Sequence, residues 1–113
     1  MESRYQYQFA KRAEADLDDI IRYIAVELMN PVAAGNFLDE LQKVIDRIRM
    51  FPESGSLVLN DFIPDMGVRK KVIGNYIMYY LPDSDDQTII ILRIVYGRRN
   101  MDEILRTLGD ICV

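Results

Sequence analysis

The spacing of the hydrophobic residues changes twice along this chain, and each change marks a change of secondary structure. Tyr5, Tyr7 and Phe9 recur at every second position, which predicts a half-buried strand. Between residues 13 and 48, apolar residues recur at the intervals of an amphipathic helix. Segments with strand periodicity return between 68 and 96. A chain of this kind must combine helices and strands in one fold, because helices precede a run of strands.

The helical region divides into two helices at Asn30-Pro31. Asn suits the N-cap, and Pro suits the first helical position because its missing N–H would have no partner there. The first helix has no such polar cap at Ala10, and the second should end near Met50, before Phe51-Pro52. The short connection predicts an antiparallel helical hairpin. The two apolar stripes are Ala13, Leu17, Ile20, Ile21, Ile24 and Leu28, and then Ala34, Phe37, Leu38, Leu41, Val44, Ile45 and Ile48.

Strands dominate the second half of the chain. Residues 52–67 show no period and hold two prolines and two glycines, which predicts an ordered surface loop. Strands are expected at 68–73, 76–81 and 88–96; the last is apolar on both faces and belongs inside the sheet. Asn100 should open a short final helix. The order β-α-α-β-β-β-α predicts an α+β fold, with the helical hairpin packed on a mostly antiparallel four-stranded sheet.

The length and the apolar runs limit where such a chain can act. Its 113 residues fit a single domain, 1–113. The longest apolar run, 89–92, is far too short to cross a bilayer, and the N-terminal segment lacks the apolar core of a secretory signal. Cys112 is the only cysteine, so no intramolecular disulfide is possible. We expect a protein of the cytoplasm.

The sequence contains no histidine. This removes the commonest general base and the commonest metal ligand. The acidic residues at 16, 18 and 19 diverge around a helix, and those at 83, 85 and 86 lack the Gly and distal Glu of a calcium loop. Both groups are interpreted as solvated surface, and we expect no metal and no cofactor.

Charge is distributed unevenly. The formal net charge is −4, which disfavours steering onto a phosphate backbone. Basic residues nevertheless gather in the last third of the chain, and they would form a local positive patch if they converged in space. The candidate target-binding residues are Arg69, Lys70, Lys71, Arg93, Arg98 and Arg99.

Each of these cations also has a purely structural interpretation. A basic strand can guard a sheet edge against pairing with another chain. Alternation would place Arg69 and Lys71 on one face of the sheet and Lys70 on the other. Arg93 lies inside an apolar run, on the parity of Ile89, Ile91 and Val95, and must find a carboxylate or reach water. The arginines at 98 and 99 can simply solubilise the end of a strand.

Several segments occur here in a recognisable order. They are AEADLDDIIRYIA at 13–25, Asn30-Pro31-Val32-Ala33-Ala34, Phe51-Pro52-Glu53-Ser54-Gly55, Val68-Arg69 with the basic strand, Tyr76 through Tyr80, and ILRIVYGRR at 91–99. Over roughly residues 5–108 the ordered set resembles the RelE/ParE toxin superfamily. The resemblance implies a type II toxin that a cognate antitoxin wraps and neutralises. RelE-like members resemble ribosome-dependent ribonucleases that cut mRNA, and ParE-like members inhibit DNA gyrase without known hydrolysis.

Metal-independent RNA cleavage needs a base, cations for the developing charge and an acid for the leaving oxygen. If the chain is RelE-like, the resemblance assigns the cations to Arg69, Lys71 and Arg99, and Tyr96 would have to stand in for the acid in a rearranged site. The RelE-like pattern has a late Tyr or His around Leu105, but neither occurs after Tyr96 here, and the loop before the basic strand is acidic. The 91–99 stretch and the Pro52 loop are closer to the ParE-like pattern, so a gyrase inhibitor is the first hypothesis and an mRNA endonuclease the second.

The expected partners follow from these hypotheses. A cognate antitoxin comes first, laying a helix or an extended strand over the toxin's grooves and sheet edge in a hetero-oligomer. The target is DNA gyrase, or the ribosome with its mRNA in the alternative hypothesis. A third possibility is an inactive module that only binds an antitoxin, which predicts no growth arrest on expression alone.

Overall fold

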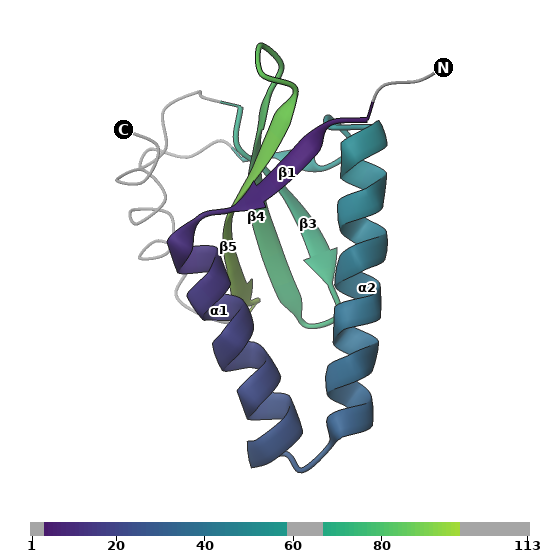
Figure 1. Ribbon diagram of the computed structural model, residues 1–113, viewed down its shortest axis with the longest axis vertical. Helices are drawn as coiled ribbons and strands as arrows, with labels where there is room; N and C mark the ends of the chain where they lie inside the picture. Colours follow the sequence, from purple (N-terminus) through teal and green to yellow (C-terminus); the bar gives the residue numbers. More distant parts are fainter. Residues whose placement is uncertain (1–3, 59–66, 98–113) are drawn as a thin grey trace.

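The computed structural model describes residues 4–58 and 67–97. It has two layers, a sheet and a pair of helices that cover one face of that sheet (Figure 1). The elements are β1 (Gln6–Phe9), α1 (Lys11–Arg22), the π-helical turn η1 (Tyr23–Glu27), α2 (Pro31–Met50), β2 (Ser56–Leu57), β3 (Arg69–Ile73), β4 (Tyr76–Asp83) and β5 (Thr88–Tyr96). This confirms the predicted α+β class and the predicted order through the last strand. The predicted helix from Asn100 lies outside the described residues.

The sheet has five strands in the order β1-β5-β4-β3-β2, one more than predicted. β1 runs parallel to β5, and the other neighbouring pairs are antiparallel. The additional strand, β2, pairs Ser56 with Lys70 and Leu57 with Arg69. The prediction that 52–67 forms only a loop is wrong at these positions, because a two-residue strand is too short to show a hydrophobic period.

The helical hairpin begins and turns largely as its caps predict. α1 starts after Ala10 without a side-chain cap, whereas the Asn30 side chain accepts a hydrogen bond from the Ala33 N–H at 3.1 Å and opens α2. α2 ends at Met50, as expected before Phe51-Pro52. The first helix departs from the prediction, because its last part is the π-helical turn η1 instead of regular α-helix. Within the described part of the chain, no helix is long and apolar enough to cross a membrane.

The chain leaves η1 through a left-handed residue, Met29, whose φ is +50°. The Asn30 N–H donates to the Ile24 carbonyl at 3.1 Å, and the Met29 N–H donates to the Val26 carbonyl at 3.2 Å. The Met29 bond matches one bond of the motif that commonly ends helices, in which the left-handed position is usually Gly, whereas the Asn30 bond reaches one residue farther back than in that motif. A side chain with a Cβ costs about 1–2 kcal/mol in this conformation.

The apolar core lies on both faces of the sheet. The helix-covered cluster is Ala13, Ile20, Ile24, Ala34, Phe37, Leu41, Ile45, Ile48, Ile73, Met78, Tyr80, Ile89, Ile91 and Ile94, and the opposite cluster is Val58, Val68, Tyr79, Leu92 and Val95. β5 contributes to both clusters, which confirms its predicted interior position. A register shift makes Leu92 an extra residue on β5, because Tyr80 lies opposite Ile91 while Tyr79 lies opposite Arg93. Simple alternation predicted that Val95 would share the face of Ile91. This prediction is wrong, because the extra residue places Val95 on the opposite face.

Candidate functional site

A buried tyrosine fixes the loop that follows α2. The Tyr80 hydroxyl, on β4, donates to the Pro52 carbonyl and accepts the Gly55 N–H, both at 2.9 Å. Gly55 is itself buried, and a Cβ there would lie 2.5 Å from the Tyr80 oxygen and 2.7 Å from the Lys70 carbonyl oxygen. The loop is thus held against the sheet by a hydrogen-bonded side chain at a position where only glycine fits.

Arg69, the first residue of β3, is engaged by the same loop. Its Nη1 donates to the Gly55 carbonyl at 2.8 Å and to the Glu53 carbonyl at 3.1 Å. A pocket of about 590 Å³ opens beside it, lined by Tyr5, Met50, Phe51, Pro52, Glu53, Ser54, Gly67, Arg69, Pro82 and Ser84. Part of the hydrogen-bonding capacity of this predicted target-binding cation is therefore used to position the loop.

Burial raises the pKa of the Tyr80 hydroxyl above its ordinary value of 10.0, although the Gly55 N–H, Arg69 and Ser54 offset part of this rise. Because the pKa is higher in the folded than in the unfolded state, the stability contributed by the neutral hydroxyl is complete below about pH 10. It is lost as pH rises through the folded-state pKa. We expect the free energy of unfolding in urea to fall above pH 10, with a shallower fall in Tyr80→Phe. Equal slopes for the two proteins would contradict this assignment.

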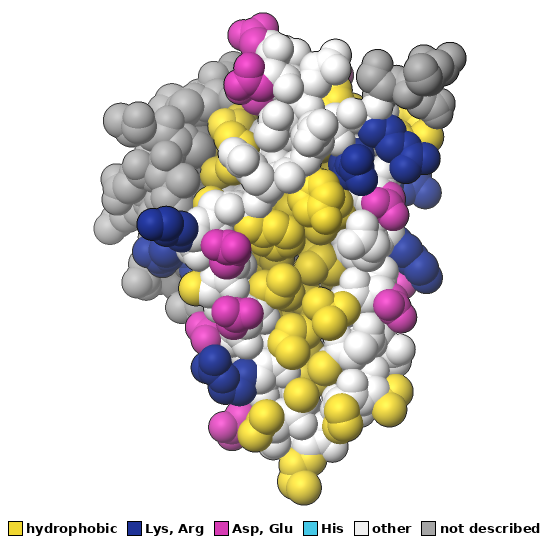
Figure 2. Space-filling model, viewed as in Figure 1, with side chains coloured by type: hydrophobic (Ala, Val, Ile, Leu, Met, Phe, Trp, Pro, Cys, Tyr) yellow, Lys and Arg dark blue, Asp and Glu magenta, His cyan; other side chains and the backbone are white. Residues whose placement is uncertain are grey.

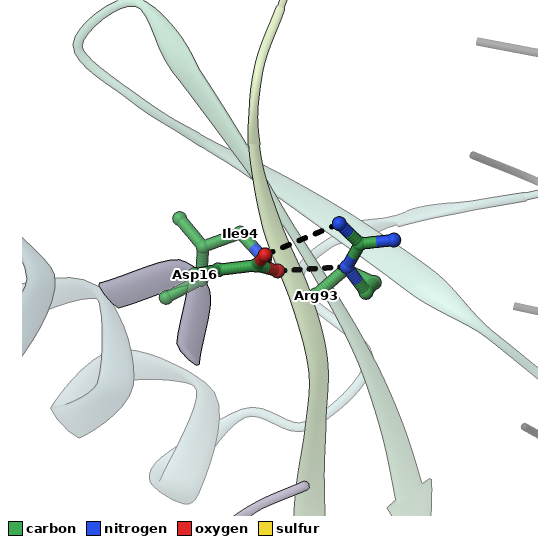
Figure 3. Close-up of polar contacts among 3 residues, drawn as sticks. All are labelled: Asp16, Arg93 and Ile94. Carbon is green, nitrogen blue, oxygen red and sulfur yellow. Dashed lines mark hydrogen bonds and ion pairs between the residues drawn. The ribbon is translucent and has the colours of Figure 1, made fainter. Parts of the chain in front are cut away.

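Arg93, on β5, forms a buried ion pair with Asp16 of α1 (Figure 3). The arginine Nε and Nη2 donate to the two carboxylate oxygens at 2.7 and 3.1 Å, and the Ile94 N–H donates to the same carboxylate at 3.0 Å. β1 pairs with β5 only as far as Ile91, so Asp16 takes over a strand N–H beyond the end of β1. The carboxylate therefore both neutralises Arg93 and completes the edge of β5.

The remaining described members of the predicted target-binding set are Lys70 and Lys71. On the neighbouring strand β4, Lys71 lies opposite Met78 of the helix-covered cluster, and Lys70 lies opposite Tyr79 of the other cluster. This confirms the predicted alternation, with Arg69 on the face of Lys71. No carboxylate of the described residues forms an ion pair with either lysine.

Tyr96, the proton donor in the ribonuclease hypothesis, lies at the other end of the sheet from Arg69. It is paired with Tyr76, which is paired with Ile73. Four residues along the strands and two strand spacings separate it from Arg69, a distance of roughly 16 Å. Arg99, the fourth member of that predicted set, lies outside the described residues.

An apolar surface separates the two helices. α1 packs on β1 and β5, whereas α2 packs on β3 and η1, so the helices diverge over the sheet (Figure 1). Figure 2 shows apolar side chains at the surface between them and charged side chains on the flanks. We call this surface the interhelical strip; the partly buried apolar side chains of its helices are Leu17, Ile21, Ala25, Ala33 and Val44.

A second apolar site opens near the junction of the helices. This cavity of about 710 Å³ is lined by Tyr23, Ile24, Leu28, Ala33, Asn75, Tyr76 and Tyr96, and none of these side chains is charged. Tyr76 stands edge-on between Phe37 and Tyr96, with ring centroids 5.2 and 5.7 Å away. The cavity was not predicted from the sequence, since its lining comes from η1, α2, β4 and β5, and hydrophobic period alone does not show which residues of separate elements meet.

These surfaces are suited to the recognition of another molecule. Among the described residues, no group of His, Cys, Asp or Glu side chains is placed to hold a metal ion. The most extended features are apolar surfaces and a loop held by Tyr80 and Arg69. Such features suit contact with another macromolecule better than the binding of a small charged substrate.

Comparison with known proteins decides the family. The sequence model for the ParE toxin of the type II toxin-antitoxin system, parDE, matches residues 7–101. The chain belongs to the ParE toxin family. This confirms the resemblance found in the sequence, and this ParE-family chain is a type II toxin. None of the curated proteins matches it at a significant level.

Two solved structures show the same fold as this ParE-family toxin. The chromosomal ParDE system from P. aeruginosa aligns with a TM-score of 0.63 and 21% identity, covering 82% of this chain and 96% of that chain. The toxin–antitoxin complex RelBE2 from Mycobacterium tuberculosis aligns with a TM-score of 0.60 and 18% identity, covering 85% and 94%. The likeness is one of fold alone, and because it extends to both types of system it does not identify a target.

In this ParE-family toxin, the four described residues of the predicted target-binding set do not form one cluster. Arg69 holds the loop after α2, Arg93 is sequestered by Asp16, and the two lysines project from opposite faces of β3. Arg98 and Arg99 lie outside the described residues. Contact between any of these residues and a target remains a prediction.

Proposed function

We propose that this ParE-family toxin acts by binding and inhibiting DNA gyrase, and that a cognate antitoxin keeps it inactive. The observation that best supports the proposal is the distance between Arg69 and Tyr96. A general acid and the cation that stabilises the reacting phosphate must act on the same few atoms. A gap of roughly 16 Å between the two side chains' strand positions is too wide for that.

Charge supports the same choice of target. The net charge of −4 disfavours docking among ribosomal RNA phosphates. A protein target makes no such demand, because protein interfaces rely on apolar contacts with a polar rim. Of the described residues in the predicted target-binding set, we expect Lys70 and Lys71 to contact the target. Arg93 is expected to stabilise the fold through its ion pair with Asp16 and not to contact the target.

The interhelical strip supports the proposed antitoxin. Monomeric proteins rarely leave a continuous apolar surface uncovered, and such surfaces commonly mark binding sites. A strip between two diverging helices fits an amphipathic helix that places its apolar face on the toxin. Neutralisation would then follow from a helix of the antitoxin lying along this strip.

The proposal is tested with two assays on the purified toxin, gyrase supercoiling and ribosome-primed mRNA cleavage. We expect inhibition of supercoiling at micromolar toxin and no cleavage of mRNA. If the toxin does not inhibit supercoiling at this dose, the proposal that DNA gyrase is its target is wrong. Cleavage that depends on Arg69 and Lys71 would instead favour the second candidate, an mRNA endonuclease, which the position of both residues on one face of β3 supports.

Tyr96→Phe separates the two candidates within the cell. Removal of a proton-transferring group lowers a reaction rate by about 10²–10⁴-fold, whereas a gyrase inhibitor does not need this proton. We therefore expect the inducer dose for growth arrest to stay within about twofold of the wild-type dose. The conservative change keeps the ring against Tyr76. Growth arrest that disappears in this variant would favour the endonuclease, and an absence of arrest by the wild-type chain would favour an inactive module.

A further inference from the structure

The junction of the two helices carries an unusual concentration of exposed apolar side chains. Val26, Met29 and Val32 are 63%, 83% and 72% exposed, and with Val72 they are the most exposed large hydrophobic residues in the described part of the chain. We call the first three the hairpin tip. The junction lies at one end of the molecule's longest axis, where Figure 2 shows apolar side chains projecting from the surface.

The backbone at the tip opposes the stability of the fold. Met29 holds a left-handed conformation in which Gly or Asn would be less strained. The same residue is the most exposed large hydrophobic side chain in the described part of the chain. A residue that is unfavourable both for the backbone and for solvation is better explained by binding than by folding.

Charge limits what can cover the tip. Glu27 is the only charged residue between Arg22 and Asp39, so the tip offers no Lys or Arg to an anionic surface. Membrane surfaces and nucleic acids are bound through such cations. The partner that fits is therefore a protein with an apolar site.

Area and shape limit the partner further. Three side chains present at most a few hundred Å², whereas a stable interface buries about 800 Å² on each partner. The tip alone is therefore too small to hold two copies of this chain together. A projecting apolar group of this size is typical of an anchor that enters a pocket at the centre of a larger interface.

We infer that the hairpin tip is the anchor by which this toxin engages its target protein, inserting Val26, Met29 and Val32 into an apolar pocket on that protein. The inference rests on the proposed function, since it supposes that the toxin acts by binding a protein target. It assigns the target to the projecting end of the hairpin and leaves the interhelical strip to the antitoxin.

The test compares Val26→Ser/Met29→Asn/Val32→Ser with the single variant Leu38→Ser. Leu38 is a matched control because it is an exposed apolar residue of α2, 42% exposed, and lies six residues beyond Val32, outside the tip. With purified gyrase, we expect the triple variant to need at least about tenfold more protein for half-inhibition of supercoiling, and Leu38→Ser to stay within about twofold. Equal potency of the triple variant and the wild type would overturn the inference, as would an equal loss in both variants.

Met29→Asn alone separates binding from folding. Asn tolerates the left-handed conformation, so the Tm should equal or exceed that of the wild type while inhibition weakens. A lowered Tm with unchanged inhibition would show that Met29 serves the fold, against the inference. If the wild-type chain does not inhibit gyrase, the proposed target fails separately. The dose for growth arrest then provides the same comparison, and arrest by the triple variant at the wild-type dose would overturn the tip assignment.

Discussion

Asp16→Ala is expected to lower the free energy of unfolding by about 3–5 kcal/mol, because it leaves Arg93 buried without a counter-charge. The Arg93 side chain is only 4% exposed, so water cannot replace the lost carboxylate without opening the structure. The Ile94 N–H loses its acceptor at the same time. Urea unfolding followed by far-UV circular dichroism measures the loss, and a decrease below 1 kcal/mol would contradict this account.

Two further variants show whether burial is the cause. Asp19→Ala removes an ion pair with Arg22 at 3.5 Å whose side chains are 75% and 69% exposed, and it should cost less than about 0.5 kcal/mol. Asp16→Leu/Arg93→Met removes both buried charges and should recover much of the stability, since no lone charge remains. A recovered fold with wild-type inhibition of the target would show that Arg93 acts structurally. If stability recovers but inhibition of the target does not, Arg93 would instead be assigned to the residues that contact the target.

The sequence alone predicted that Arg93 needs a partner, but it did not predict which residue provides it. Arg93 stands in an apolar run, so a carboxylate partner or a route to water was required by the cost of burying a charge. The identity of that partner was not predictable, because Asp16 lies 77 positions earlier among acidic residues of a solvated helix. The register shift at Leu92 also changes which side chains share a face after Ile91. Local period cannot reveal either fact, since both depend on how distant strands and helices meet.

The order of the elements was predictable because long segments repeat their pattern. The stripes of α1 and α2 and the apolar run of β5 each extend over several periods, and the elements that they predict are confirmed. Two stripe positions are wrong, because Leu28 and Leu38 are 55% and 42% exposed. Short features were not predictable: β2 has two residues and η1 has five, and neither length establishes a period. The interhelical strip was missed for another reason. A helical stripe shows which side of a helix is apolar, but not how far two helices diverge over a sheet.

Gly55→Ala and Gly35→Ala are expected to change stability in opposite directions. At Gly55 a new Cβ would lie 2.7 Å from the Lys70 carbonyl oxygen, which belongs to the backbone and cannot rotate away. The loop must therefore shift, at a cost of about 1–3 kcal/mol. At Gly35, inside α2, no atom beyond the neighbouring residues and the backbone of the same helix lies within 4 Å of the new Cβ. Alanine there should stabilise the protein by about 1 kcal/mol, because it restricts the unfolded chain and favours helix.

The direction of the Gly55 effect also tests how the loop is held. If the loop moves away from the sheet, the Tyr80 hydroxyl loses its bond to the Gly55 N–H, and Arg69 loses its bond to the Gly55 carbonyl. The guanidinium of Arg69 would then be freer than in the wild type. Urea unfolding and susceptibility of the 51–55 segment to proteolysis should both report the change in Gly55→Ala, and neither should report it in Gly35→Ala. A Gly55→Ala protein as stable as the wild type would mean that the contact with the Lys70 carbonyl is relieved without disturbing the loop, and that Tyr80 and Arg69 alone fix its position.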